Sequence, residues 1–221
     1  MDNTNTNTES RPVSGCNGLQ FKAVGKIIVT QGQNEGLTIQ ADPEICSRVH
    51  TEVKDGILVI AYDSDWKDWT GINFIDKGVA TFHLTLKDIK SLAISGVGNL
   101  DSASIISDSL TLSLSGPATM TYGTLTVNML KVDMSGVGSI DLAGKCLEQN
   151  ISLSGAGSYK ASRLESERAT VKLSGVGSAT VLVSESLDVS ISGAGAVEYY
   201  GNPKISQKIS GIGVLKYLGT R

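Results

Sequence analysis

Both tryptophans of the 221-residue chain lie in one short acidic segment, residues 63–71. Trp66 follows Asp65 directly, and Trp69 follows Asp68. An exposed indole can stack on a sugar ring while a neighbouring carboxylate accepts hydrogen bonds from the sugar hydroxyls. The four residues are therefore a candidate glycan-binding site. The plainer alternative is that the rings cover an apolar edge of the domain, and the acids lack the glycine and distal glutamate of a calcium loop.

The histidines and cysteines show no spacing that suggests a shared site. His50 and His83 are 33 positions apart, and His83 lies on the polar side of an alternating segment, which favours a solvated side chain over a ligand or base. Cys16, Cys46 and Cys146 have no metal-ligand spacing. Cys16 and Cys46 could pair in an oxidising compartment, whereas Cys146 is predicted to be a lone thiol. No catalytic residue, cofactor or metal is predicted.

The elements that would position any site are set by a repeat. The phrase Ser-Gly-x-Gly, or a near copy, occurs seven times between residues 92 and 218, at steps of 20, 20, 19, 20, 18 and 18 residues. Steps this constant are typical of a solenoid, in which each coil buries its apolar face only against its neighbours. The phrase predicts sharp structural turns rather than a phosphate cradle, because it opens no helix. The predicted turn residues are Ser95, Gly96, Gly98, Ser135, Gly136, Gly138, Ser154, Gly155, Gly157, Ser174, Gly175, Gly177, Ser192, Gly193, Gly195, Ser210, Gly211 and Gly213.

Apolar and polar residues alternate on both sides of the phrase. Leu92 and Ile94 flank Ala93 before it, and Leu100 precedes Asp101 after it. A period of two indicates strands with one face inward, and the remaining residues of each repeat are too few and too polar for a helix. We therefore predict an all-β fold, a parallel β-helix or β-solenoid of about seven coils of 18–20 residues, preceded by a strand-rich N-terminal cap region.

Three regions are predicted along the chain. Residues 1–18 are a low-complexity polar run expected to be a disordered tether. Residues 19–91 form the strand-rich N-terminal part, with a helical turn after Pro43 that Asp42 caps. Residues 92–221 form the repeats, and no cap is visible beyond the last coil. An uncapped coil exposes unpaired strand, so it could support self-association.

Composition excludes some partners. A net charge of −3 with 19% charged residues gives no basic field for nucleic acid. No apolar run approaches the roughly 20 residues that cross a bilayer. The N-terminal run lacks the charged and apolar regions of a signal peptide. The protein is then either cytoplasmic or exported with a signal or lipoprotein anchor already removed.

Several stretches together resemble a known family. They are residues 29–32, 56–60 and 86–92 and the Ser-Gly-Val-Gly-Asn of residues 95–99 with the Ser-Gly-x-Gly coils that follow. The chain from about residue 19 to residue 218 is similar to the putative auto-transporter adhesin, head GIN domain family. The resemblance implies a β-helix-like domain that Gram-negative bacteria export to the cell envelope, where it takes part in adhesion. It brings no catalytic residues.

Three functions follow, in order of preference. The first is a non-enzymatic envelope or cell-surface protein, periplasmic, attached to the outer membrane or on the surface, that binds a glycan, matrix or protein partner. The second is a structural scaffold that assembles end to end through its C-terminal coil. The third is a polysaccharide-acting β-helix enzyme, which would need a groove lined by acids and basic residues.

Overall fold

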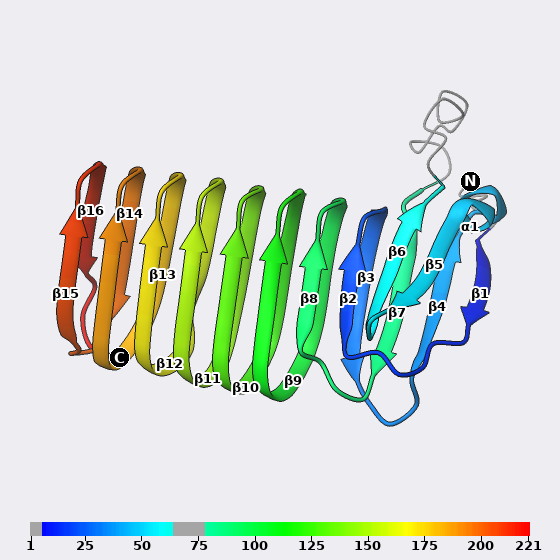
Figure 1. The fold of residues 1–221 in the computed structure, drawn as a ribbon, viewed down its shortest axis with the longest axis horizontal. Coiled ribbons are helices and arrows are strands. Elements are labelled where there is room, and N and C mark those ends of the chain that lie inside the picture. Colours follow the sequence, from blue (N-terminus) through cyan, green and yellow to red (C-terminus); the bar gives the residue numbers. More distant parts are fainter. Residues whose placement is uncertain (1–5, 64–77) are drawn as a thin grey trace.

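The computed structural model describes residues 6–63 and 78–221 and is almost entirely β structure, with 75% of residues in strands and 3% in a helix. Figure 1 shows a straight rod of stacked coils with a broader cap at the N-terminal end. The predicted β-solenoid is confirmed, with about six turns rather than seven. Its strands are β9 (Val97–Leu114), β10 (Pro117–Met134), β11 (Val137–Leu153), β12 (Ala156–Leu173), β13 (Val176–Ile191), β14 (Ala194–Tyr200), β15 (Lys204–Ile209) and β16 (Ile212–Tyr217).

Each full coil is one long bent strand that pairs in parallel with the next coil. Equivalent residues lie in register, so that Met120 of β10 is opposite Leu100 of β9 and Ile140 of β11. All three are fully buried. The remaining residues of each repeat, which were predicted to be too few and too polar for a helix, are also in strands. In β9 they include the fully buried Ile105 and Leu110. Pairing along the whole coil satisfies backbone groups that an irregular segment would leave to water.

The glycine corners let successive coils approach closely. At Ser154 the amides of Ser154 and Gly155 both donate to the carbonyl oxygen of Met134 in the preceding coil, at 2.9 and 3.2 Å. A Cβ atom at Gly155 would collide with the carbonyl oxygen of Gly136 below it. Only glycine lacks that atom, which explains why the same residue returns at all seven Ser-Gly corners.

One coil of the rod carries no Ser-Gly phrase. Strand β2 (Gly18–Phe21) pairs in parallel with β8 (Ser91–Ile94), and β3 (Val24–Gln31) pairs with β9. The amide of Ser95 donates to the carbonyl oxygen of Phe21 at 2.9 Å. Residues 22–25 therefore form the corner of the preceding coil, on which the Ser95 corner stacks. Figure 1 shows β2 and β3 beside β8 although some 60 residues separate them in sequence. Stacking therefore begins before residue 92.

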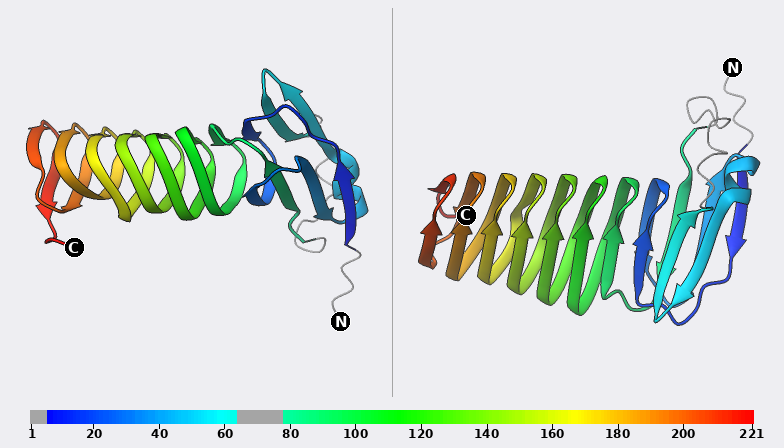
Figure 2. Two further views of the ribbon diagram at one scale, coloured as in Figure 1. Left: turned by 90° about the horizontal axis from the view of Figure 1, so that it is seen from below. Right: turned by 45° about the horizontal axis from the view of Figure 1, so that its top comes forward.

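The residues between β3 and β8 form the cap. It contains β4 (Gly36–Ala41), α1 (Pro43–Arg48), β5 (Val49–Lys54), β6 (Ile57–Tyr62) and β7 (Thr81–Leu86). Strands β4 and β7 pair antiparallel, as do β5 and β6. The predicted helical turn is confirmed, with the Asp42 side chain accepting a hydrogen bond from the amide of Glu44 at 2.9 Å. Figure 2 shows this cap covering one end of the rod, while the opposite end is a coil like the others.

The prediction of a disordered tether over residues 1–18 is wrong for the described residues 6–18. Strand β1 (Asn7–Arg11) pairs antiparallel with β4, and Val13 and Cys16 are buried. The guanidinium of Arg11 links this strand to the cap by donating to the carbonyl oxygen of Val49 at 2.6 Å. The polar composition misled the prediction because an edge strand with both faces largely exposed needs few apolar residues.

Candidate functional site

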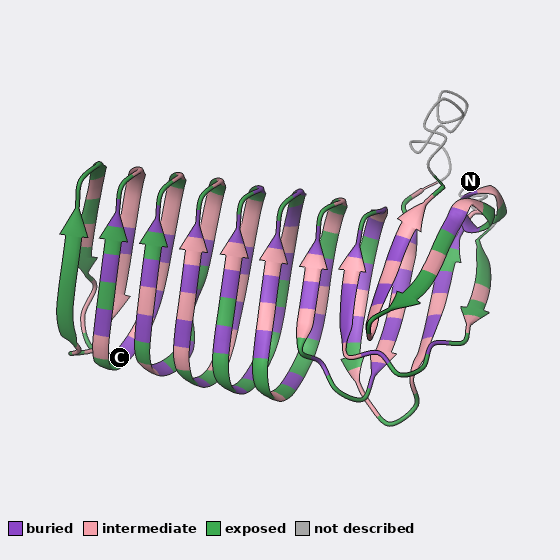
Figure 3. Ribbon diagram, in the orientation of Figure 1, coloured by how far each residue is buried: buried purple, intermediate pink, exposed green. Residues whose placement is uncertain are grey.

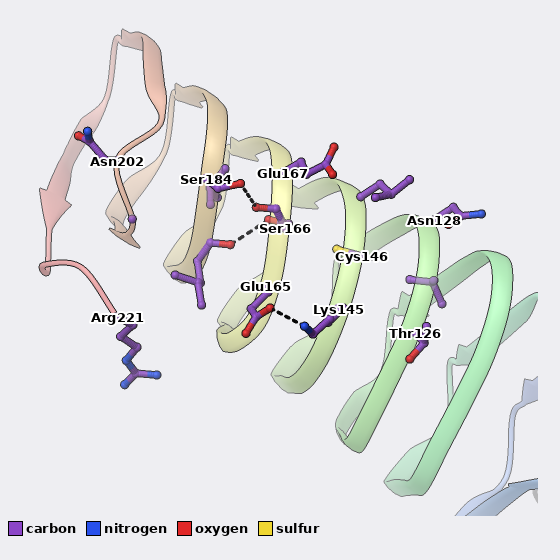
Figure 4. A pocket seen from close by; sticks show the side chains of 15 residues that line it. Thr126, Asn128, Lys145, Cys146, Glu165, Ser166, Glu167, Ser184, Asn202 and Arg221 are labelled. Atoms are coloured by element: carbon purple, nitrogen blue, oxygen red, sulfur yellow. Dashed lines mark hydrogen bonds and ion pairs between the residues drawn. The ribbon is translucent and has the colours of Figure 1, made fainter.

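A groove runs along one side of the rod and crosses its last coils (Figure 4). Its volume is about 680 Å³. We call it the side groove; it is lined by Thr126, Val127, Asn128, Lys145, Cys146, Leu147, Glu165, Ser166, Glu167, Leu182, Val183, Ser184, Gly201, Asn202 and Arg221. Coils stack about 4.8 Å apart, so a groove that spans five coils is roughly 20 Å long.

The groove follows from strand alternation repeated in register. Its floor is the column Val127, Cys146, Ser166 and Val183, in which each residue pairs with the next and all are buried. Neighbouring residues in each strand point outward. One wall therefore contains Lys145 and Glu165, and the other contains residues such as Asn128 and Ser184. The side chains form two parallel rows with the floor between them.

The shorter C-terminal coils shape one end of the groove. Ala161 pairs with Val181 and Glu165 pairs with Leu182, so residues 162–164 bulge from the ladder. Arg221 reaches back to this bulge, where its guanidinium donates to the carbonyl oxygen of Ser162 at 2.8 Å. The same guanidinium lies 4.4 Å from the ring centre of Tyr200, within the range of a cation–π contact. Arg221 and Asn202 therefore form the C-terminal end of the groove.

Three of the charged groups of the groove are exposed and form ion pairs. Lys145 Nζ lies 3.2 Å from Glu165 Oε2, and these side chains are 75% and 61% exposed. Glu167 Oε2 lies 3.3 Å from the guanidinium of Arg168. Such pairs contribute little to stability but present both donors and acceptors to a bound molecule. Hydroxyl and amide groups of Thr126, Asn128 and Ser184 add further polar contacts.

A polar network lies beneath the floor. The Gln149 amide, which is fully buried, donates to Ser166 Oγ at 2.8 Å, and Ser166 Oγ donates to the carbonyl oxygen of Leu182 at 2.9 Å. Burial raises the pKa of the nearby Cys146 thiol to about 12. A thiol in that state is a poor nucleophile at neutral pH. The floor is therefore a fixed and unreactive surface.

The structure does not describe the residues predicted from sequence to bind a ligand. Trp66, Trp69, Asp65 and Asp68 fall outside the described residues. His50 is exposed on β5, and His83 on β7 has its Nε2 3.3 Å from Gln40 Oε1. Cys16, Cys46 and Cys146 are all free and buried, so no disulfide joins Cys16 to Cys46. Over residues 6–63 and 78–221, no three His, Cys, Asp or Glu side chains come together as a possible metal site.

Sequence reasoning missed the side groove. Lys145 and Glu165 are 20 positions apart, one coil length, which was the available signal that they are neighbours. The shortening of the repeat from 20 to 18 residues was a second signal, because a shorter coil must leave a step in the surface of the rod.

The coil geometry agrees with a family model. Residues 17–203 match the model described as "Putative auto-transporter adhesin, head GIN domain". The chain belongs to this family. The match begins one residue before β2 and ends just before β15, so it covers the cap and most of the solenoid. The resemblance seen in the sequence is thereby confirmed.

Solved structures share the whole fold. A putative adhesin from Bacteroides fragilis is 24% identical, with a TM-score of 0.90 over 96% of this chain and 97% of that one. A putative adhesin from Parabacteroides merdae is 19% identical, with a TM-score of 0.74 over 98% and 97%. A protein from Parabacteroides distasonis described as a putative lipid binding protein is 20% identical, with a TM-score of 0.74 over 98% of both chains. No curated protein matches the chain.

Proposed function

We propose that the protein is a non-enzymatic, exported adhesin of the bacterial cell envelope that holds an extended polymer in the side groove. The observation that carries the proposal is the groove itself, a rigid trough along the rod with polar side chains on both walls and a buried floor. Because the groove is open along its length, it can bind an internal part of a polymer chain as well as the end of the chain. A surface glycan and an extended segment of a matrix protein are both polymers of this kind.

The groove chemistry favours a glycan. Sugar hydroxyl groups both donate and accept hydrogen bonds, and the walls offer Lys145 and Arg221 as donors, Glu165 as an acceptor, and Asn128 and Ser184 as both. Because Asn128, Lys145, Glu165 and Ser184 lie on paired strands, their backbone would need little reordering on binding. Adhesion also suits membership of a family described as adhesins.

The side groove is poorly suited to the alternative of a polysaccharide-cleaving enzyme. A glycosidase needs one carboxyl group kept protonated by an apolar environment and a second one ionised. Glu165 is mostly exposed and paired with Lys145, and Glu167 is paired with Arg168. Neither carboxyl group lies in the apolar environment that such an acid requires.

Export and attachment at the envelope remain part of the proposal. In the described part of the chain, no helix has the length and apolarity needed to span a membrane. Cell fractionation, together with digestion of intact cells by an added protease, tests the location of the full-length gene product.

Binding to a glycan array tests the groove. Ser184→Trp places a large ring in the groove, and Ser190→Trp places the same ring at another exposed position of β13. We expect the first variant to lose at least about tenfold in affinity for any glycan bound by the unaltered protein, and the second to retain it. Equal binding by both variants would contradict the proposal, as would the absence of binding to every glycan and matrix protein tested.

The segment with Trp66 and Trp69 remains a second proposed glycan contact, with Asp65 and Asp68 as hydrogen-bond acceptors. A Trp66→Ala/Trp69→Ala double variant distinguishes it from the side groove on the same array. Loss of binding in this variant but not in Ser184→Trp assigns the ligand to the tryptophan segment.

A scaffold that assembles end to end is the second candidate function, and the observation behind it is the exposed apolar side chains of the C-terminal coil. Ile205 and Ile209 on that coil are 43% and 40% exposed. Light scattering over a range of concentrations tests it, since a constant monomer mass rules out end-to-end assembly.

A further inference from the structure

The last coil ends the rod with an unfinished sheet. Strand β15 pairs only with β13, and β16 pairs only with β14, within the described part of the chain. Each strand therefore has one edge with unpaired backbone groups. Figure 3 shows β15 exposed along its whole length, whereas the strands before it alternate between buried and exposed residues. The N-terminal end differs because the antiparallel cap covers it.

The inward column of β15 keeps two of the three apolar residues of β13, with Gln207 opposite the buried Val189. Ile205 and Ile209 are in register with Leu187 and Ile191 of β13, which are fully buried. Ile209 is 40% exposed only because no coil lies above it. Another strand laid over β15 would bury these side chains as the interior coils do, and the gain would scale with the apolar area covered.

Charge indicates what kind of strand fits. Residues 176–198 contain three acidic residues and no basic one, whereas residues 199–221 contain four basic residues and no acidic one. Coils of opposite sign thus adjoin at the end of the rod, where Lys216 Nζ lies 3.6 Å from Glu198 Oε1. Lys204 and Lys208 face outward on β15 and have no ion-pair partner among the described residues. Continuing the same alternation requires an acidic strand.

A second copy of this chain fits poorly at this edge. Two C-terminal coils brought end to end would place Lys204, Lys208 and Lys216 against the same three lysines. Like charges that face each other across a strand pair are destabilising, and lysines on an edge are a known means of preventing self-pairing.

We propose that the edge formed by β15 and β16 binds an extended segment of another polypeptide chain in which apolar and acidic residues alternate, by β-strand addition. The apolar residues of the segment cover Ile205 and Ile209, and its acids pair with Lys204 and Lys208. Its backbone completes the hydrogen bonds of β15, which is how strand addition supplies affinity while side chains supply specificity. This site lies at the end of the rod and is separate from the side groove.

Fluorescence anisotropy with two labelled peptides tests the proposal. One peptide alternates valine with glutamate, and the other alternates valine with lysine. We expect the glutamate peptide to bind at least about tenfold more tightly than the lysine peptide, with the difference decreasing as salt is raised. Lys204→Glu/Lys208→Glu should reverse the preference. The matched control Lys160→Glu/Lys172→Glu makes the same charge change on the exposed side of β12 and should leave the preference unchanged.

Every other outcome counts against strand addition at this edge. Equal binding of both peptides, or a preference that the Lys204 and Lys208 changes leave intact, overturns the proposal. So does concentration-dependent self-association that excludes the glutamate peptide, because a second copy would then occupy the edge. Ser184→Trp should not alter peptide binding, which separates this result from failure of the side groove to bind a glycan.

Discussion

Tyr159 and Gln149 are joined by a 2.6 Å hydrogen bond inside the solenoid, in which the phenol hydroxyl donates to the amide oxygen. Both side chains are fully buried and belong to neighbouring coils. The amide nitrogen of Gln149 then donates to Ser166, whose side chain lies in the floor of the side groove. A hydrogen-bonded chain therefore connects the core of the rod to its candidate binding surface.

Replacing Gln149 should weaken the fold by leaving its partners unsatisfied. Gln149→Leu keeps a similar volume but removes the acceptor for Tyr159 and the donor to Ser166, and we expect a loss of about 1–3 kcal/mol in the free energy of unfolding. Urea denaturation measures it. Adding Tyr159→Phe should cost less in the Gln149→Leu background than in the unaltered protein, because the hydroxyl has already lost its partner. Strictly additive effects would contradict the network.

A corner glycine should tolerate no side chain. Gly155→Ala places a methyl group against the carbonyl oxygen of Gly136, and the coils must separate to accept it. We expect thermal unfolding to show a loss of about 1–3 kcal/mol or more. Gly36→Ala is the matched control, since a Cβ atom there meets nothing within 4 Å, and it should be close to neutral. Similar losses in both variants would show that the corner does not require glycine.

The stability of the fold should decline in alkaline solution partly through Cys146. Burial raises the pKa of this thiol from 9.0 to about 12. The contribution of this thiol to the free energy of unfolding is complete below pH 9, where it is protonated in both the folded and the unfolded chain. The contribution is lost as the pH rises toward 12, because the thiol ionises first in the unfolded chain. Cys146→Ala should therefore show a shallower fall in unfolding free energy between pH 9 and 11. If the unfolding free energies of Cys146→Ala and the unaltered protein fell equally with pH, ionisation of Cys146 would not be the cause.

The three thiols should also be protected from alkylation in the folded protein. Burial raises the pKa of Cys16 and Cys46 as well as that of Cys146. Because the thiolate is the reactive form, iodoacetamide at pH 8 should modify none of them until the chain is denatured, when all three react without a reductant. Intact mass measures the number of modified thiols. Fewer than three in the denatured, unreduced chain would reveal a disulfide.

Arg11 should hold the N-terminal strand onto the cap. Its guanidinium donates to the carbonyl oxygens of Val49 and Cys46, at 2.6 and 3.2 Å. Arg11→Ala removes both charge-assisted bonds, and we expect a loss of about 1.5–3 kcal/mol together with faster hydrogen exchange in β1 and β4. Glu9→Gln, which keeps the strand and weakens only the pair with Arg11, should change exchange far less. Unchanged exchange in Arg11→Ala would show that strand pairing alone retains β1.

The sequence determined the architecture of the rod because its information is local and repeated. Ser-Gly-x-Gly at a nearly constant step, with Leu112 and Leu114 or their equivalents alternating around polar residues, specifies both the corner and the inward face. Any in-register stacking of such coils gives the observed core. The helical turn after Asp42 was equally local and was also predicted correctly.

The tertiary structure decided what depends on contacts between distant or dissimilar segments. Residues 22–25 became a corner although they lack serine and the first glycine, because the coil at Ser95 lies directly above them. The polar strand β1 is held by Arg11, whose carbonyl acceptors on Val49 and Cys46 are more than 30 positions away. The side groove arises where Lys145 and Glu165 come into register and Arg221 folds back to Ser162. Periodicity predicts which residues face inward, but the shape of the surface depends on how coils of unequal length are stacked.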